Sequence, residues 1–338
     1  MTPPNASPPG PSTPVRVGVI GVGHLGRHHV RLLATTPGAA LVAAVDRDRA
    51  RAEAAAGPAG CEVLTDASGL IGRVDAVVVA VPTVDHLSVA RPFLERGVHV
   101  LVEKPMARSL DEADELVAIA ARSGARLAVG HTERFNPAVR AAQSALSAPR
   151  FIEVHRLSGF PERSLDIDVV FDVMIHDLDV ILSIDRSEVV SVEAVGIPVL
   201  TPHVDIANAR LRFASGCVAN ITASRISRDK VRKVRFFQPD LYVSIDYGAQ
   251  EVEAWRLRHR DGDRPAIEGG AVPVEKAEPL AVELADFVGA IRAGRDATVT
   301  GQAGRAALAL ATRVAEAMEV GTTGATGTSG TTGSRNLS

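Results

Sequence analysis

Residues 15–26, with the sequence VRVGVIGVGHLG, join a short β-branched run to three glycines, and a segment with helical periodicity begins at Leu25. In such a strand–loop–helix context Gly21 allows a tight turn, Gly23 lets a ligand approach the backbone, and Gly26 permits close packing of the helix on the strand. A pyrophosphate would bind the N–H groups and the positive dipole end of that helix. We therefore predict a dinucleotide site formed by Gly21, Gly23, His24, Leu25 and Gly26.

Short strands and longer helices alternate through the first part of the chain. Strand-like runs lie at 15–20, 41–45, 75–81, 98–103 and 126–130. Helix-length amphipathic segments lie at 25–34, 85–96 and 110–123. Strands separated by crossover helices form parallel sheets, so the alternation predicts an α/β domain with a doubly wound parallel sheet over residues 15–136.

The pattern changes to paired strands after about Pro137. Residues 207–213 and 217–223 flank Ala214-Ser215-Gly216, which is typical of a β-hairpin turn, and 242–247 and 251–258 form a second pair around Gly248. Residues 137–320 are therefore predicted to form a separate α+β domain with a largely antiparallel sheet. A late helical pattern, interrupted at Gly294, could pack on either domain.

Composition limits the classes of partner. The chain has 338 residues, 46% of them hydrophobic, and a net charge of −3, which gives no reason to expect a nucleic-acid partner. Cys61 and Cys217 lack metal-ligand spacing and do not resemble a disulfide framework, so we expect no metal and a cytoplasmic location. Residues 1–14 and 321–338 are predicted to be a disordered leader and tail, with neither a signal peptide nor a membrane span.

Asp46 and Arg47 bear on the choice of cofactor. Asp46 ends the second strand about 20 residues beyond the glycines, where a carboxylate accepts hydrogen bonds from the adenosine ribose, and this favours NAD. Arg47 could instead face a 2′-phosphate, which keeps NADP as an alternative, or it could be an exposed loop residue.

Pro82, Thr83 and His86 follow the strand-like run at 75–81, and we expect them beside the nicotinamide half of the cofactor. His86 could equally be a surface residue in the first turn of its helix. The same interpretation applies to His29, to which we assign no chemical role.

An apolar strand ends in Glu103, Lys104 and Pro105. A lysine at the carboxyl end of a strand points into the crevice where open α/β sheets bind ligands, so Glu103 and Lys104 are candidates for contact with the cofactor. The same residues could simply end the strand in solvent. Pro105 biases Lys104 toward extended backbone, and the sequence leaves the bond between them either cis or trans.

Asp172 and His176 stand four residues apart in a segment with helical character, so their side chains share one face. Such a pair could handle a proton in a cleft, or it could be a structural hydrogen bond on an exposed face. Asp177 and Asp179 beside them could contact the hydroxyl groups of a substrate, but we expect them to be solvated or to form helix salt bridges.

Two other groups are candidates for substrate contact. Arg134 and Asn136 follow the last strand of the first domain and could reach a substrate or the nicotinamide. A basic run between two strands could hold phosphates, as arginine does well, or be a solvated loop. Its members are Arg225, Arg228, Lys230, Arg232, Lys233 and Arg235.

Four motifs in this order resemble the Gfo/Idh/MocA family of oxidoreductases. They are the glycine loop 21–26, the loop 82–86, Glu103 to Met106, and Asp172 to His176, and the resemblance covers nearly all of residues 15–318. It implies a Rossmann domain followed by a domain with an open sheet whose face makes an oligomer interface, so we expect a homodimer or homotetramer. It also implies NAD or NADP as the cofactor and a sugar or cyclitol as the substrate.

The resemblance implies roles for three residues. The family's acid and histidine fall on Asp172 and His176, and its lysine falls on Lys104. His176 would accept the hydroxyl proton of the substrate, Lys104 would stabilise the charge on its oxygen, and Asp172 would orient the imidazole. The Lys-Pro bond is often cis in this family.

Within the family, segments 130–137, 171–181 and 205–209 resemble the UDP-N-acetylglucosamine 3-dehydrogenases. This implies oxidation of the sugar's 3-hydroxyl for 3-amino sugar (lipid A) synthesis, with a PLP aminotransferase as a pathway partner. The alternatives are another sugar or cyclitol dehydrogenase, or an NAD-dependent glycoside hydrolase. A non-catalytic nucleotide sensor is disfavoured because Lys104, Asp172 and His176 are all present.

Overall fold

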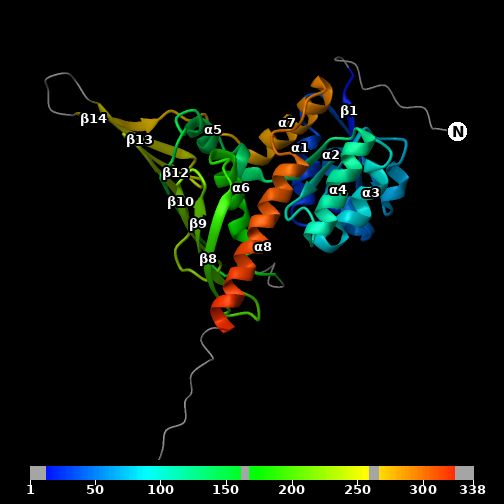
Figure 1. Cartoon of the computed structure of the whole chain (residues 1–338). Coiled ribbons are helices and arrows are strands. Elements are labelled where there is room, and N and C mark those ends of the chain that lie inside the picture. Colours follow the sequence, from blue (N-terminus) through cyan, green and yellow to red (C-terminus); the bar gives the residue numbers. More distant parts are fainter. Residues whose placement is uncertain (1–12, 161–166, 259–265, 324–338) are drawn as a thin grey trace, which may run out of the picture.

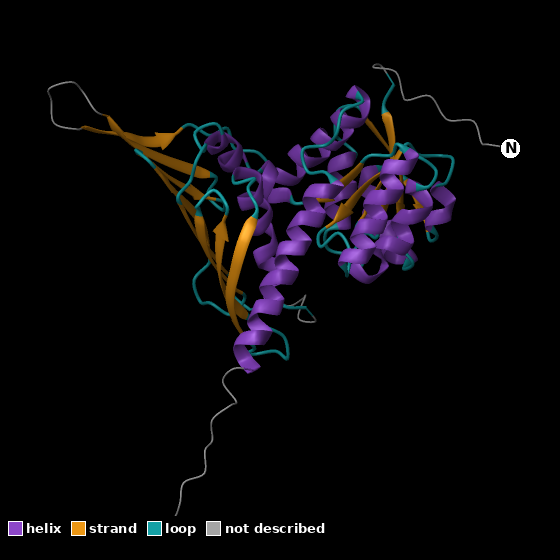
Figure 2. Cartoon of the chain, in the orientation of Figure 1, coloured by secondary structure: helices purple, strands orange, loops and turns teal. Residues whose placement is uncertain are grey.

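The chain forms two separate β-sheets, which lie on either side of a group of helices (Figures 1 and 2). The computed structural model describes residues 13–160, 167–258 and 266–323. Apart from residues 13–14 and 321–323, the predicted leader and tail lie outside the described residues.

The first sheet has six parallel strands in the order β3-β2-β1-β4-β5-β6. The order reverses beside β1, and ligands bind at the carboxyl ends of strands at such a point. The glycine loop follows β1 there. The strands are β1 (Val15–Ile20), β2 (Ala39–Val45), β3 (Glu62–Leu64), β4 (Ala76–Val79), β5 (His99–Glu103) and β6 (Leu127–Gly130). The predicted doubly wound parallel sheet is confirmed, and only the three-residue β3 was missed.

Helices cover both faces of this sheet, which is why its strands are almost wholly apolar. Residues of α3 and α4 pack with Val77 and Val79 on one face. Residues of α1 and α2 pack with Val17 and Val19 on the other. The helices are α1 (Gly26–Leu33), α2 (Arg49–Ala59), α3 (His86–Leu94) and α4 (Leu110–Ser123).

The second sheet has eight strands in the order β14-β13-β12-β11-β7-β10-β9-β8. Every neighbouring pair is antiparallel except β7 with β10. The strands are β7 (Phe151–Leu157), β8 (Val189–Ile197), β9 (Ile206–Phe213), β10 (Val218–Ser224), β11 (Val231–Gln238), β12 (Leu241–Asp246), β13 (Glu251–Arg258) and β14 (Ala266–Val272).

Both predicted strand pairs are confirmed, as β9 with β10 and β12 with β13. Four strands were missed, β7, β8, β11 and β14. The basic run was placed between strands, but its second half lies within β11. In β11 charged residues interrupt the apolar ones, and this obscured the strand in the sequence.

The remaining helices join the two sheets. Figure 1 shows α6 and α8 against one face of the second sheet. Helix α8 also contacts α4 and β6, and α7 returns to pack against α1 and β1. We propose that the domain boundary lies near residue 136, with α7 attached to the first domain. These helices are α5 (Pro137–Gln143), α6 (Ile175–Ile184), α7 (Pro279–Ala293) and α8 (Gly301–Thr323).

Candidate active site

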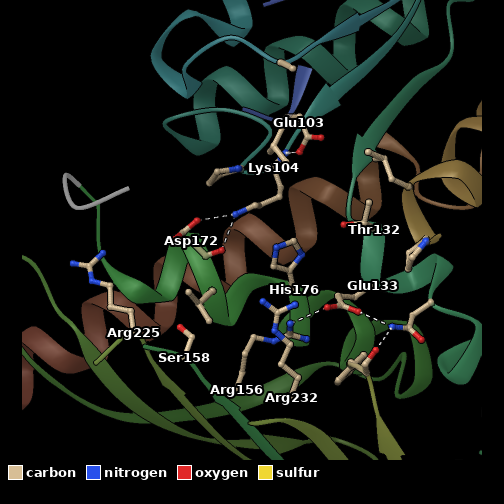
Figure 3. A pocket seen from close by; sticks show the side chains of 18 of the residues that line it. Glu103, Lys104, Thr132, Glu133, Arg156, Ser158, Asp172, His176, Arg225 and Arg232 are labelled. Atoms are coloured by element: carbon tan, nitrogen blue, oxygen red, sulfur yellow. Dashed lines mark hydrogen bonds and ion pairs between the residues drawn. The ribbon is translucent and has the colours of Figure 1, made fainter. Parts of the chain in front are cut away.

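A cavity of about 920 Å³ lies where the carboxyl ends of β4 and β5 approach the helix-covered face of the second sheet (Figure 3). Its size is that of a pocket for a small molecule or cofactor. The first sheet contributes Leu25, Pro82, Thr83, His86, Glu103 and Lys104 to its lining. The segments after β6 contribute Glu133, Arg156, Asp172, His176, Lys230 and Arg232, among others.

The glycine loop has the geometry that a pyrophosphate requires. Gly21 has a φ of +85°, and a Cβ there would lie 2.7 Å from the Val81 nitrogen. A Cβ on Gly26 would lie 1.7 Å from the Gly21 carbonyl oxygen, whereas a Cβ on Gly23 would have no atom within 4 Å. The loop is thus tightly packed at its two ends and open at its centre, and these residues fit a dinucleotide. His24 follows the open position and is exposed.

Asp46 is tied to this loop. Its carboxylate accepts hydrogen bonds from the backbone N–H of Val22 at 3.0 Å and of Asp48 at 2.9 Å. Carboxylate oxygens keep further lone pairs, which remain available to ribose hydroxyls. The side chain of Arg47 is 89% exposed, and its nearest carboxylate is Asp85 at 3.9 Å. Arg47 therefore matches the alternative of an exposed loop residue.

His86 is not a surface residue, so that alternative was wrong. It is 1% exposed, with Nδ1 3.0 Å from the Pro105 carbonyl oxygen and Nε2 3.0 Å from that of Val81. Burial lowers the pKa of His86, and a neutral imidazole donates to only one of these two oxygens. His86 holds the loop after β4 against the turn after β5, while Pro82 and Thr83 line the cavity.

Glu103 forms a buried pair that the sequence did not predict. Its Oε1 lies 2.7 Å from Nε2 of His29, and its Oε2 accepts the Lys104 backbone N–H at 3.2 Å. Burial alone would raise the pKa of Glu103, but the hydrogen bond from His29 and the nearby positive charges hold it below the usual range. His29 is fully buried, so the expectation that it lies at the surface was wrong.

Lys104 reaches across from the first sheet to the second. Its Nζ donates to the backbone oxygen of Asp172 at 2.7 Å and to Asp172 Oδ1 at 3.0 Å (Figure 3). The Lys104-Pro105 bond is cis. The alternative that Lys104 ends its strand in solvent was wrong, because its side chain is only 11% exposed.

Asp172 does not orient His176, contrary to the sequence-based expectation. No hydrogen bond joins their side chains within the described residues, and Asp172 pairs with Lys104 instead. Residues Val170–Met174 form a single π-helical turn before α6. The Asp172 carboxylate in this turn points toward Lys104, and His176 follows it in α6 (Figure 3).

His176 faces the cavity from α6. Its Nδ1 is buried and has no hydrogen-bond partner among the described residues. Its ring lies edge-on to that of His131, with 6.1 Å between the ring centroids. Burial, followed by the charges of Lys104 and Arg156, lowers the pKa of His176 well below its usual value. The imidazole is therefore neutral at neutral pH and can accept a proton.

His131 makes stability depend on pH. Burial, followed by the charges of Lys104 and Arg134, lowers its pKa to about 3 from the ordinary 6.5. Below pH 6.5 the His131 imidazole therefore becomes protonated in the unfolded chain but stays neutral in the folded chain. The free energy of unfolding is unaffected by this residue above pH 6.5, and it decreases as the pH falls from 6.5 toward 3. Between pH 6.5 and about 5.5 we expect a loss of about 1 kcal/mol of unfolding free energy from this residue. Urea titrations should show this part of the loss abolished in His131→Phe, and an identical pH dependence in both proteins would contradict the assignment.

Arg134 and Asn136, predicted to reach a substrate or the nicotinamide, both bond to other parts of the protein. Arg134 lies 3.3 Å from Asp179 Oδ1 and does not line the cavity. Asn136 borders the cavity, but its Nδ2 donates to Glu133 Oε2 and to the Tyr247 carbonyl, both at 3.1 Å. Its oxygen caps α5. Folding brings each of them a distant partner, the Asp179 carboxylate for Arg134 and the Tyr247 carbonyl for Asn136.

The predicted solvation of Asp177 was wrong, because the residue forms an interior ion pair. Asp177 is fully buried, and Arg156 on β7 donates to its two oxygens at 2.6 Å and 2.9 Å. Arg156 also donates to Glu133 at 2.8 Å and lies over the Tyr247 ring. Sequence reasoning missed Arg156 and Glu133, and the only signal was the alternation of β7, which places Arg156 on the buried face.

The basic run does not act as a unit. Arg225 is 1% exposed and donates to Asp205 at 2.8 Å, while Lys233 and Arg235 pair with Asp246 and Glu153. Lys230 and Arg232 line the cavity.

Within residues 13–160, 167–258 and 266–323, no group of His, Cys, Asp or Glu could hold a metal ion, and both cysteines are free. The helices of the same ranges include none that is long and apolar enough to cross a bilayer.

Comparison with known proteins gives matches over both sheets. A model described as an oxidoreductase family with an NAD-binding Rossmann fold matches residues 15–131, and one described as a GFO/IDH/MocA C-terminal domain matches residues 139–244. The UDP-N-acetylglucosamine 3-dehydrogenase of Acidithiobacillus ferrooxidans is 40% identical over 310 residues, which are 90% of this chain and 97% of that protein. The inositol 2-dehydrogenase of Rhizobium meliloti is 29% identical over 88% of this chain and 94% of its own length.

Solved structures agree with these matches. That of the A. ferrooxidans 3-dehydrogenase superposes with a TM-score of 0.84 at 39% identity, covering 90% of this chain and 98% of that one. A levoglucosan dehydrogenase in complex with NADH and levoglucosan gives a TM-score of 0.82 at 19% identity over 91% of this chain and 98% of that one, and it shares the fold.

Proposed function

The chain belongs to the Gfo/Idh/MocA family of NAD-binding oxidoreductases, which act on CH–OH groups, and from that membership we propose that it oxidises the 3-hydroxyl of UDP-N-acetylglucosamine to a ketone. The observation that carries the proposal is the placement of the Lys104 ammonium and the neutral His176 imidazole in one cavity beside the glycine loop. The 40% identity with the A. ferrooxidans enzyme supports the choice of substrate.

The residues divide the work of removing two hydrogens from the alcohol. Bound NAD supplies the acceptor for the hydride that leaves carbon 3. Lys104 donates a hydrogen bond to the hydroxyl oxygen and stabilises the negative charge that develops there. His176 accepts the hydroxyl proton as the C=O bond forms. Asp172 holds the Lys104 ammonium in place and acts as a positioning residue.

Incubation with NAD and UDP-N-acetylglucosamine tests the proposal. We expect NADH absorbance to rise and mass spectrometry to show the 3-keto sugar, more completely when an aminotransferase consumes the ketone. No turnover even with that coupling would contradict the proposed substrate. Because the inositol dehydrogenase relative favours a cyclitol as the second candidate, myo-inositol is the matched comparison. Release of free sugar from a nitrophenyl glycoside without net NADH would support a hydrolase instead.

Assembly and pathway context belong to the same proposal. Helices cover one face of the second sheet in Figure 1, and large apolar side chains are exposed on its strands, among them Val190, Val195, Phe237, Trp255 and Ile267. Exposed apolar surface of this kind marks interaction sites. We propose a homodimer or homotetramer, working in the cytoplasm before a PLP aminotransferase, and light scattering would measure its size.

Asp46 is expected to set the cofactor preference. Its carboxylate accepts ribose hydrogen bonds from NAD and repels the 2′-phosphate of NADP. In Asp46→Ala we expect the ratio of kcat/KM for NAD to that for NADP to fall about tenfold or more. Steady-state kinetics with both cofactors measure the ratio. The control is Asp48→Ala, which removes the N-cap of α2 two residues away, and an unchanged ratio in Asp46→Ala would contradict the role.

A further inference from the structure

Two arginines stand directly opposite each other on neighbouring strands in the cavity. Arg156 on β7 and Arg232 on β11 are register partners, and both line the cavity (Figure 3). The alternation of β11 places Arg232 on the same face as the buried Val234 and Phe236. Like charges directly opposite each other destabilise a sheet, so this pair needs compensating negative charge.

Only one of the two arginines receives that charge from the protein. Arg156 is paired with Asp177 and Glu133. No carboxylate forms an ion pair with Arg232 in the parts of the chain that the structure describes, nor with Lys230, two residues earlier. Both of these side chains are exposed to the cavity.

The other charges of the cavity are already matched. Lys104 pairs with Asp172, and Arg225 pairs with Asp205. The cavity carboxylates are also occupied, Glu103 by His29 and Glu278 by Arg31. The remaining excess is therefore positive and lies at Lys230 and Arg232.

The same strand provides an internal comparison. Lys233 and Arg235 lie on the opposite face of β11, away from the cavity, and each has a carboxylate partner, Asp246 and Glu153. The cations of this strand that face away from the cavity are neutralised within the sheet, whereas Arg232, which faces into it, is not. This difference indicates that an anionic ligand completes the cavity.

We infer that Arg232 and Lys230 bind the diphosphate of a nucleotide sugar, an inference that rests on the proposed function. Guanidinium groups bind phosphate oxygens through paired hydrogen bonds, and an ammonium adds a point charge. In such a substrate one hexose ring carries both the reacting hydroxyl and the phosphate. Lys104, His176 and Arg232 all line the one cavity, so a hexose bound beside Lys104 and His176 has Arg232 within the same enclosure (Figure 3). Binding the sugar between Lys104 and Arg232 selects against neutral cyclitols, which have no phosphate.

Calorimetry with UDP on the NADH-loaded enzyme tests the site, with UDP-N-acetylglucosamine kinetics beside it. We expect Arg232→Met to weaken UDP binding about tenfold or more and to raise KM similarly, with kcat changed much less. Lys230→Met should act in the same direction. Arg235→Met is the matched control, since it removes a cation from the same strand on the opposite face. NADH affinity should be unchanged in all three variants, and circular dichroism checks their folding.

The outcomes separate this inference from the proposed function. If the wild type binds UDP but does not oxidise UDP-N-acetylglucosamine, and Arg232→Met loses the binding, the diphosphate site holds and the substrate is wrong. If the wild type turns over and Arg232→Met keeps both its KM and its UDP affinity, the inference is overturned. Weakened NADH binding in Arg232→Met would assign the residue to the cofactor's phosphates and would also overturn it. No turnover and no UDP binding in the wild type would overturn both.

Discussion

Lys104→Met should lower kcat about a thousandfold or more, with almost no change in the affinity for NADH. The ammonium lies within hydrogen-bond distance of Asp172 and is only 11% exposed, so little water shields the charge that it offers to a substrate oxygen. Methionine keeps most of the length of the side chain and removes the charge. Because the stabilisation is needed in the transition state, the loss should appear in kcat more than in KM.

Stopped-flow hydride transfer and calorimetry with NADH measure these two quantities. Lys233→Met is the control, since Lys233 pairs with Asp246 on the opposite side of the second sheet. A Lys104→Met enzyme that keeps kcat within tenfold of the wild type, or that no longer binds NADH, would contradict the assigned role.

His176→Asn should lower kcat by about a hundredfold to ten-thousandfold, the usual effect of removing a general base. Burial and the charges of Lys104 and Arg156 lower the pKa of His176. In the wild type, activity should therefore be full at neutral pH and decline only below the ordinary histidine range, as the imidazole becomes protonated. The residual rate of His176→Asn should lack this decline.

A pH–rate profile of kcat/KM measures both features, and His155→Asn on the opposite face of β7 is the matched control. Persistence of the same acidic limb in His176→Asn would assign the limb to another group. A limb above the ordinary histidine range in the wild type would contradict the lowered pKa.

Local pattern was enough to predict the first sheet and the positions of Gly21, Gly26 and Lys104. Each of these residues acts through its own backbone conformation or its position at a strand end, and both are encoded within a few neighbouring residues. The surroundings of Arg134 and Asn136 could not be predicted, for the opposite reason. Their hydrogen-bond partners, Asp179 and the Tyr247 carbonyl, reach them only when distant segments pack together.

Burial was the property that sequence reasoning judged least well. His29 and Asp177 were expected near solvent, and a surface position was one of the two alternatives for His86. Each of the three lies inside the protein with a specific partner. A buried polar group is tolerated only where its partner is supplied, and the partner of His29 stands 74 positions away. The π-helical turn before His176 had no sequence signal, and neither had the bond from Lys104 to Asp172, which joins residues 68 positions apart.

The contact between Lys104 and Asp172 connects the two halves of the chain. Lys104 follows β5 of the first sheet, and Asp172 precedes α6, which packs on the second sheet. In the proposed mechanism neither half of the chain holds all the reacting groups, since Lys104 follows the first sheet and the His176 imidazole comes from α6 beside the second. The redox half of the protein can therefore stay unchanged while mutations in the second sheet alter which alcohol is presented to it. Under this proposal, the residues to redesign for a new substrate lie in the second half of the chain.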